Sequence, residues 1–503
     1  MSRMVRVPID LGFYQSPSLP FAAQECQGLI PVVSQGEGSS SRGALFNIPG
    51  ESQFAEVKVA LPNRISTFRG RHEFGGLMYV IAGDGGAATL FSISELGAVT
   101  QIGTTGFINS PLNSDNNLAD TAIIDDNGET MAIVIPGVAS YFYDTTNGLV
   151  QITDSIFKDF EAESGGVTSV VEVDGYFLFS TNVSIFQSSL VTVNMGQTFA
   201  ALAFLSPFLK QDLIRVGRAR GQLFALGENT TKVFRNVATE PFAFLEVPGA
   251  TIEKGITFRG GWVSFDNSFF LWGGGENETD AIWRGVGSGS VQKVSTDAID
   301  DKLAEVRYSQ STAAAYSWNG QLVVGFDNSD ASMFFNITAS ALKGQFVWFT
   351  DISGFTIPYL GIYGKIMTFR ASGLIGEFDS SINSLVVGLT RTCIFAGRYL
   401  VGQGEHLFVD EIELLAETGV AQQVWDSPAD SNPQVLLEYS KDAGRTWISK
   451  GSRSMGEYGK YNTLIRWNRL GRFNDKAIFR FTTTTNNRQA FTEMKITLEE
   501  SFE

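Results

Sequence analysis

The feature that most constrains the fold is a unit that recurs about every 45 to 50 residues along the sequence. Each unit has a glycine-containing turn, a short strand rich in aromatic and β-branched residues, and then a second turn and strand. One copy starts at Gly76 and covers strand segments 77–81 and 90–93. The other turns lie near Gly128, at Gly175 and Gly221, near Asn267, and at Gly320 and Gly364. This period is typical of a β-propeller, so we predict an all-β fold with six or seven blades. An irregular β-sandwich with evenly spaced turns is the alternative.

The composition fits a turn-rich β protein. Glycine (53 of 503 residues) supplies the positive φ angles that tight turns require, and phenylalanine is unusually frequent at 40 residues. One segment, 296–308, departs from the strand pattern. There Ser295 or Thr296 precedes an acidic first turn, and Ile299, Leu303 and Val306 recur at helical spacing, which predicts a short helix.

Two flanks lie outside the repeat. Residues 1–60 carry scattered prolines and a polar run at 34–42, which predicts an extended N-terminal arm. Residues 61–385 hold the propeller repeats. Residues 386–503 show longer strands in which apolar and polar side chains alternate, as in 408–414 and 494–499, and this pattern predicts a C-terminal antiparallel β-sandwich.

The charge is acidic and unevenly distributed. The chain has 37 basic and 53 acidic residues, a net charge of −16, which disfavours a dedicated nucleic-acid or anionic-membrane binder. Residues 434–503 hold 12 basic and 8 acidic side chains and are therefore basic within an acidic protein. Two cysteines and two histidines are too few for a zinc cluster or a disulfide framework. We find no export signal, and the longest apolar run, 199–209, is about half of a membrane-spanning helix, so we expect no membrane anchor.

A turn motif near the C-terminus raises the question of an enzyme. The segment 440–447 matches an Asp box, in which the aspartate caps a hairpin turn, glycine permits the turn and tryptophan packs beneath it. Sialidase propellers carry this motif, so a sialidase-like or glycan-binding propeller is an alternative. We interpret the motif as a structural turn, because turn chemistry accounts for every specified residue: Ser440, Asp442, Gly444, Thr446 and Trp447.

Other catalytic patterns are weak. The carboxylate groups at 125–126, 300–301 and 410–413 are explained by a turn, a helix start and a solvated strand face. Neither His72 nor His406 lies in a nucleophile-elbow context. We therefore expect no catalytic residues, no metal, no cofactor and no enzymatic activity.

A basic and aromatic stretch, 445–480, is the strongest candidate for a binding surface. Arginine, tryptophan and tyrosine are enriched at protein–protein hot spots, although alternating arginines also mark a solvated strand edge. The arm adds aromatic residues. We predict subunit or partner contacts at Phe13, Tyr14, Phe21, Arg445, Arg453, Arg466, Arg469 and Arg472.

Ordered motifs across the chain resemble a known family, the packaged-DNA stabilisation proteins of short-tailed phages, which form the tail hub or nozzle. The most specific pieces are the Asp box, the Gly-x-Tyr-Gly-x-Tyr segment 456–461 and the Arg-Trp-Asn-Arg-Leu-Gly-Arg segment 466–472. Weaker pieces lie at 45–50, 69–83, 173–177, 227–234, 242–244, 252–255 and 295–299. The arm differs from the usual opening of the family.

The resemblance implies a structural virion protein of a phage tail, assembled in the host cytoplasm. It implies a homohexameric ring below the head-to-tail adaptor ring that extends the DNA exit channel and retains packaged DNA. Tail needle, plug or receptor-binding tail proteins would be further partners. Six chains of charge −16 would repel duplex DNA, so DNA would pass through the channel without specific binding. A cellular propeller scaffold is a further alternative, which would lack these motifs.

Overall fold

The computed structural model describes most of the chain, and it is almost entirely β. The described residues are 2–16, 18, 22–34, 43–57, 67–83, 87–103, 108–109, 122–163, 165–190, 198–287, 289–305, 311–327, 332–351, 359–370, 373–401, 407–421, 428–474 and 476–499. Among them, no helix is long and apolar enough to cross a membrane.

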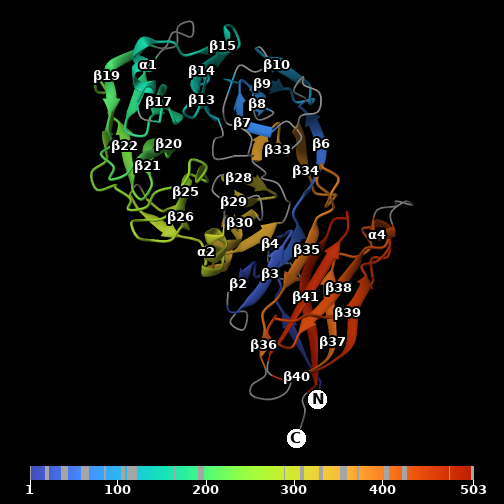
Figure 1. Cartoon of the computed structure of the whole chain (residues 1–503). Helices are drawn as coiled ribbons and strands as arrows, with labels where there is room; N and C mark the ends of the chain where they lie inside the picture. Colours follow the sequence, from blue (N-terminus) through green and yellow to red (C-terminus); the bar gives the residue numbers. More distant parts are fainter. Residues whose placement is uncertain are drawn as a thin grey trace.

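Seven antiparallel sheets of four main strands each form a β-propeller (Figure 1). Blade 1 contains β7 (Thr67–Phe74), β8 (Leu77–Gly83), β9 (Ala87–Ile93) and β10 (Val99–Ile102), with β11 (Ile108–Asn109) beside β9; blade 2 contains β12 (Ile123–Asp126), β13 (Met131–Ile135), β14 (Ala139–Asp144) and β15 (Gly148–Gln151). Blade 3 contains β16 (Ser169–Val173), β17 (Tyr176–Ser180), β18 (Ile185–Ser188) and β19 (Phe199–Leu205); blade 4 contains β20 (Leu213–Ala219), β21 (Gln222–Gly227), β22 (Thr231–Asn236) and β23 (Phe244–Glu246). Blade 5 contains β24 (Trp262–Phe265), β25 (Ser268–Gly273), β26 (Ala281–Gly285) and β27 (Val291–Lys293); blade 6 contains β28 (Thr312–Trp318), β29 (Gln321–Asp327), β30 (Ser332–Asn336) and β31 (Trp348–Asp351). Blade 7 contains β32 (Tyr359–Ile362), β33 (Lys365–Phe369), β34 (Leu374–Asp379) and β6 (Gly50–Glu56).

The blades close into a ring. The first strand of each blade contacts the first strand of the next, and β32 of blade 7 returns to contact β7 of blade 1. The predicted propeller is therefore confirmed, with seven blades. The fourth strand of blade 7 is β6, from the N-terminal part of the chain, paired antiparallel with β34. A strand from the N-terminal part of the chain thus completes the last blade and closes the ring. It also covers the edge that β34 would otherwise expose.

The C-terminal part forms the predicted sandwich. Its first sheet has the order β4 (Leu29–Val33), β5 (Gly43–Asn47), β42 (Ala490–Glu499), β37 (Leu407–Ala416) and β40 (Ile465–Phe473), and β1 (Ser2–Val7) also pairs with β42. Its second sheet has the order β3 (Ala23–Gln27), β35 (Thr392–Ala396), β41 (Lys476–Thr484), β38 (Gln434–Ser440) and β39 (Ile448–Ser454), with β2 (Tyr14–Gln15) beside β3 and β36 (Leu400–Val401) beside β41.

The N-terminal residues are not a free arm, which corrects the prediction for 1–60. Strands β1 to β5 are built into the sandwich, and β6 belongs to the propeller. Leu29, Ile30 and Leu45 are fully buried, and the burial of their apolar surface offsets the conformational entropy that this segment loses on folding. The scattered prolines and the polar run 34–42 interrupt the strand pattern of this segment, so the sequence did not predict these short strands. Part of the polar run lies outside the described residues. The domain boundary at 385/386 stays a prediction.

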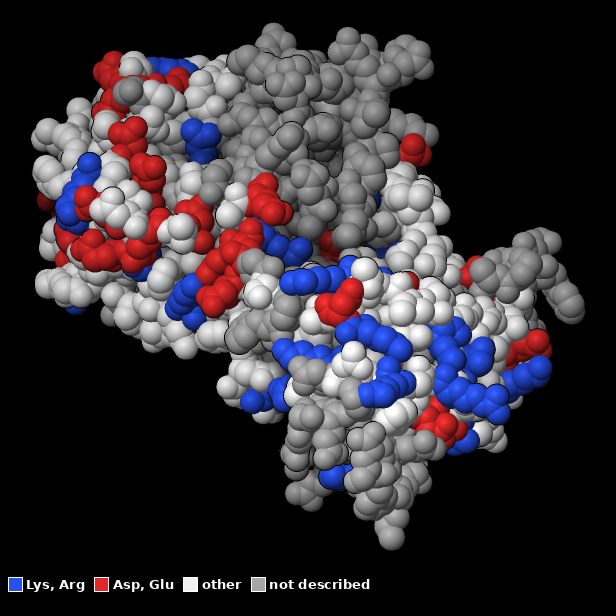
Figure 2. All heavy atoms as spheres, turned by 60° about the horizontal axis from the view of Figure 1, so that its bottom comes forward, with Lys and Arg blue, Asp and Glu red and all other residues white. Residues whose placement is uncertain are grey.

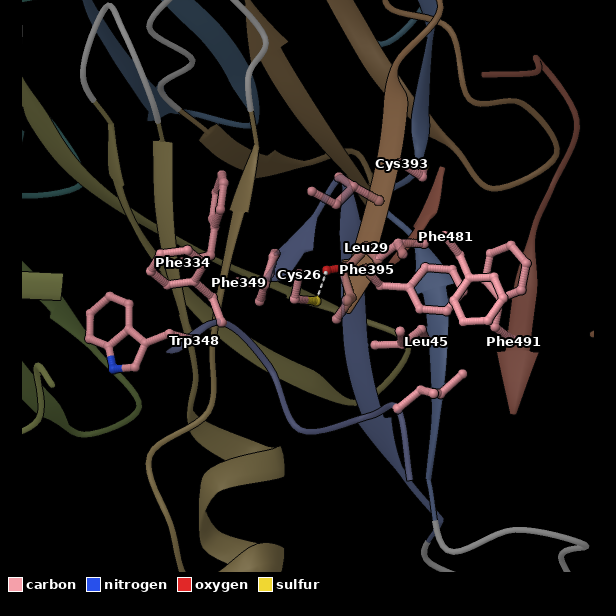
Figure 3. Close-up of a cluster of buried hydrophobic side chains, with 14 of the residues drawn as sticks. Cys26, Leu29, Leu45, Phe334, Trp348, Phe349, Cys393, Phe395, Phe481 and Phe491 are labelled. Atoms are coloured by element: carbon pink, nitrogen blue, oxygen red, sulfur yellow. Dashed lines mark hydrogen bonds between the residues drawn. The ribbon is translucent and has the colours of Figure 1, made fainter. Parts of the chain in front are cut away.

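Propeller and sandwich share one hydrophobic core. Strand β3 pairs in parallel with β31 at Gln27 and Thr350, so the second sandwich sheet continues into blade 6. Figure 3 shows rings from blade 6 on one side of this core and rings from the sandwich on the other, with Cys26, Leu29 and Leu45 between them. The labelled rings are Phe334, Trp348 and Phe349 from blade 6, and Phe395, Phe481 and Phe491 from the sandwich. The two parts are therefore packed against each other through one continuous core.

The segment 47–51 passes from the sandwich strand β5 to the propeller strand β6. Arg391 holds it: Nη1 donates to the carbonyl oxygens of Ile48 and Pro49, both at 3.0 Å, and Nε donates to Asp351 of blade 6 at 2.9 Å. At Gly50 a Cβ atom would lie 2.7 Å from two backbone carbonyl oxygens, so only glycine fits this crossing.

In the described part of the chain, four short helices lie between the strands: α1 (Ser155–Glu161), α2 (Asp297–Ala304), α3 (Ile337–Lys343) and α4 (Pro428–Ser431). The predicted helix after Thr296 is confirmed as α2. Thr296 is its N-cap, although its side chain makes no capping bond, and Ile299 and Leu303 are buried as the spacing indicated. The helix ends earlier than predicted, and Val306 lies outside the described residues.

Candidate functional site: a basic and tyrosine-rich face of the sandwich

Strands β39 and β40 bring the predicted arginines together. Each is the last strand of its own sheet, and the two strands lie side by side. Lys450 on β39 donates to the carbonyl oxygen of Arg469 on β40 at 2.8 Å, and Arg453 donates to that of Arg466 at 2.8 Å. These side chains bridge the two sheets and hold their positive charges on one surface. We call Lys450, Arg453, Arg466, Arg469 and Arg472 the basic face.

A β-bulge in β40 determines which side chains of the basic face are exposed. Along β40, Ile465 and Trp467 are buried and Arg466 is exposed, as alternation requires. The register with β37 then shifts, and Arg469 takes a positive φ of 57°. A bulge inserts an extra residue and re-aims the side chains that follow. Both Arg469 and Arg472 are consequently exposed.

The arginines differ in how far their charge is neutralised within the chain. Arg466 pairs with Glu413 at 2.5 Å and lies 3.8 Å from Glu411. Burial raises the pKa of Glu413, but hydrogen bonds from Lys495 and Arg466 outweigh it, so that pKa is lowered.

Other arginines keep their charge available. Within the described residues, no ion pair involves Arg445, Arg469 or Arg472, and the Arg472 guanidinium lies over the Phe408 ring at 5.9 Å. The charges of these three exposed arginines are therefore available to a partner.

The loop between β39 and β40, residues 455–464, adds apolar anchors to the basic face; we call it the tyrosine loop. Tyr458, Tyr461 and Leu464 are 59%, 64% and 63% exposed. The backbone beneath them is fixed, because Thr418 donates to the carbonyl oxygen of Tyr461 at 2.6 Å and the Gly459 N–H donates to that of Gly419 at 3.0 Å. Ordered, exposed tyrosines bind partners at a low cost in conformational entropy.

The sequence pattern did not predict partner contacts for Tyr458 and Tyr461. The available signal was their position in the Gly-x-Tyr-Gly-x-Tyr segment, outside any alternating strand. Figure 2 shows the wider charge distribution: Lys and Arg gather on the sandwich, and Asp and Glu gather on the propeller. A single chain thus presents surfaces of opposite charge.

Two of the three aromatic residues predicted as arm contacts, Phe13 and Tyr14, lie among the described residues and pack against their own chain. Phe13 is only 7% exposed; its N–H donates to the carbonyl oxygen of Trp348 at 2.6 Å, and Lys302 Nζ lies 5.0 Å from its ring centre. Little of the Phe13 surface is therefore left for a partner, and the predicted contact at Phe13 stays a prediction. Tyr14 is half-buried against the shared core, and Phe21 lies outside the described residues.

The Asp box forms the turn between β38 and β39, in the sandwich. Asp442 accepts hydrogen bonds from the Thr446 hydroxyl at 2.6 Å, the Thr446 N–H at 2.8 Å and the Ser440 hydroxyl at 2.7 Å, and these bonds lower its pKa to about 2. Gly444 has a φ of 86°, and its N–H donates to Ser440 Oγ. Arg480 lies over the Trp447 ring at 4.0 Å. The turn itself uses the polar side chains of Ser440, Asp442 and Thr446.

One cluster among the described residues has metal-ligand chemistry: His72, Asp125 and Asp126, at the start of blades 1 and 2. Its groups are engaged with protein partners. His72 Nε2 lies 2.6 Å from Asp126, while Asp125 accepts the Glu172 N–H at 2.8 Å. Arg218, 3.9 Å from Asp125, adds a positive charge that opposes a metal cation. Hydrogen bonding within the chain therefore accounts for this cluster.

The pKa values of this cluster follow from the same contacts. Burial raises the pKa of Asp125, although Arg218 acts against it. Burial also raises the pKa of Asp126, but hydrogen bonds from His72 and the Gly128 N–H outweigh it, and the net shift is downward.

Comparisons with known proteins agree with this architecture. A family model described as the β-propeller of bacteriophage P22 Gp10 matches residues 5–377, and one described as the β-sandwich of the same protein matches residues 392–499. No curated protein matches the sequence.

Two matches to solved structures are distant, and each has a TM-score below 0.5. One is a chain of the Chaetomium thermophilum Polycomb Repressive Complex 2 bound to GSK126, at 10% identity and a TM-score of 0.36, covering 60% of this chain and 74% of that chain. Another is the N-terminal domain of Nup159, at 10% identity and a TM-score of 0.36, covering 71% of this chain and 99% of that chain.

The two family models together span nearly the whole chain, and each matches the part of the fold that it describes. The chain therefore belongs to the bacteriophage P22 Gp10 family of phage structural tail proteins.

Proposed function

We propose that the chain is a subunit of the tail hub or nozzle, a ring of six below the head-to-tail adaptor that extends the DNA exit channel and retains packaged DNA. The observation that carries this proposal is the basic face with its tyrosine loop. Exposed tyrosine and unpaired arginine side chains on a rigid sheet edge have the composition of a protein–protein hot spot.

The charge of the chain supports a passive channel. A ring of subunits that each carry −16 repels duplex DNA, so the DNA would slide without the lysine and arginine contacts that hold phosphates. Retention of the genome would then be steric, and further tail proteins would close the lower opening. This role requires no catalytic residue and no cofactor.

The Asp box does not favour the glycan-binding alternative. It lies in the sandwich rather than between propeller strands, and the turn itself uses the polar side chains of Ser440, Asp442 and Thr446. The hub remains the better supported function.

The experiment is the native mass of the purified chain by light scattering, alone and mixed with the adaptor ring of its phage. We expect a ring of about six subunits in at least one condition. A chain that stays monomeric with the adaptor present contradicts the proposal.

A variant carrying Arg466→Ala, Arg469→Ala and Arg472→Ala should assemble more weakly. Arg488→Ala is the matched control, because Arg488 is also exposed and pairs with a glutamate, Glu417, as Arg466 does with Glu413, but it is not part of the basic face. A triple variant that assembles tails as well as the control would exclude the basic face from this role.

A further inference from the structure

We propose that neighbouring subunits dock head to tail, with the basic face and tyrosine loop of one copy against the acidic face of helix α2 of the next. This inference rests on the ring proposed above and adds the pairing of its two surfaces.

The acidic half is a row of carboxylates on α2. Asp297, Asp301 and Glu305 follow one another at four-residue spacing, so they share one side of the helix, and all three are exposed. Like charges at this spacing destabilise a helix. Within the described residues these three make no ion pair, whereas the neighbouring Asp300 pairs with Lys293 at 2.5 Å. No ion pair among the described residues therefore offsets the repulsion along this row.

The two surfaces lie on different parts of the chain. In Figure 1, α2 lies on one side of the sandwich, beside the propeller, and β38 and β39 lie on the opposite side. In Figure 2 the acidic side chains gather at the left and basic ones extend to the far right. Two different, complementary patches on one chain produce a head-to-tail contact, and such contacts close into a ring when the rotation between copies allows it.

The tyrosine loop explains why the partner is a protein surface. Arg445, Arg469 and Arg472 alone would also suit phosphate groups. Tyr458, Tyr461 and Leu464 add exposed apolar surface at the same edge, which a duplex backbone does not cover. Aromatic anchors beside unpaired charges are typical of hot spots, and the opposite charge is present on the chain itself. A second copy therefore satisfies both parts of the surface.

The test uses two charge-reversal variants. Variant A carries Arg469→Glu and Arg472→Glu, and variant B carries Asp301→Lys and Glu305→Lys. Each variant alone would bring like charges together at every contact, so we expect the protein concentration needed for half-maximal ring assembly to rise about tenfold or more. In an equal mixture, the acidic edge of A meets the basic helix of B, and the basic edge of B meets the acidic helix of A. The mixture should restore an alternating ring of even subunit number.

Light scattering with the adaptor ring measures assembly, and thermal melting of each variant confirms that it folds. A third variant, Tyr458→Ala with Tyr461→Ala, should weaken assembly and should not be rescued by A or B. Single variants that assemble like the wild type, or a mixture that stays as defective as its parts, would overturn the pairing while the hub proposal stands. Loss of duplex-DNA binding in variant A with unchanged assembly would assign the face to DNA and also overturn it. If the wild type forms no ring with the adaptor, the hub proposal fails first.

Discussion

The ion pair between Glu51 and Arg370 fastens the seventh blade, and removing one partner should loosen the ring where it closes. Glu51 lies on β6 and Arg370 follows β33; their side chains are 1% and 0% exposed. Arg370 donates to the Glu51 carboxylate through Nε at 3.0 Å and through Nη2 at 2.5 Å, and the Val386 N–H adds a third bond at 3.2 Å. Arg370→Met keeps the length of the side chain and leaves the carboxylate buried without its charge partner.

The size of the effect follows from burial. Breaking a fully buried pair costs about 3–5 kcal/mol, because one charge stays desolvated and unpaired. The same blade supplies a matched control, the pair between Lys365 and Glu377, whose side chains are 43% and 26% exposed. An exposed pair of this kind contributes about 0–1 kcal/mol. The double variant Glu51→Gln with Arg370→Met removes both charges and should recover much of the loss.

Hydrogen exchange of the β6 and β34 amides is the appropriate assay, because it measures the opening of this strand pair directly. At 1.36 kcal/mol per factor of ten, the loss in Arg370→Met corresponds to exchange that is roughly 150 to 5,000 times faster at β6. Lys365→Met should change the same amides by less than about tenfold. If Arg370→Met leaves exchange at β6 within threefold of the wild type, the buried pair is not what holds the ring closed.

Three further predictions test other parts of the molecule. Burial raises the pKa of Asp327 to about 7, so between about pH 4 and 7 the native chain holds a proton that the unfolded chain has lost. The free energy of unfolding should therefore fall as pH rises through this range. Urea titrations at about pH 5 and 8 should show a smaller fall in the Asp327→Asn variant than in the wild type. The pKa of Asp442 is lowered, so its contribution to stability has the opposite pH dependence: the turn should be stable above about pH 4 and weaken as pH falls toward 2. Asp442→Ala should speed amide exchange at Thr446 at neutral pH without changing exchange in the blades. Arg469→Gly relieves the strain of a positive φ, so the free energy of unfolding should stay the same or rise by at most about 1 kcal/mol, and the melting temperature should not fall. Ring assembly should weaken in the same variant. A clear loss of stability would contradict the strain argument.

Patterns that repeat locally could be predicted from the sequence. Glycine turns at regular spacing, short aromatic strands between them, and alternating strands near the C-terminus identified the propeller and the sandwich, because these periods depend on neighbouring residues alone. The same holds for α2, where capping and spacing agree, and for the Asp box, whose hydrogen bonds all form within seven residues.

The candidate site could be predicted only in part. Interleaved arginine and aromatic residues at 445–480 pointed to β39 and β40, and the structure brings Arg453, Arg466, Arg469 and Arg472 to that edge of the sandwich. Aromatic content alone did not show that Phe13 is buried, because nothing in its local sequence indicates its contacts with Trp348 and Lys302.

The sequence by itself determined the class of each part: a bladed propeller, an alternating sandwich and a motif that forms a turn. Only the tertiary structure decided that the first 56 residues complete both parts, with β3 joining the sandwich to blade 6 and β6 closing blade 7. The reason is physical: the partner of a strand is chosen by which exposed edge and which apolar face remain to be covered once the chain has folded, and for β6 that partner lies more than 300 residues away.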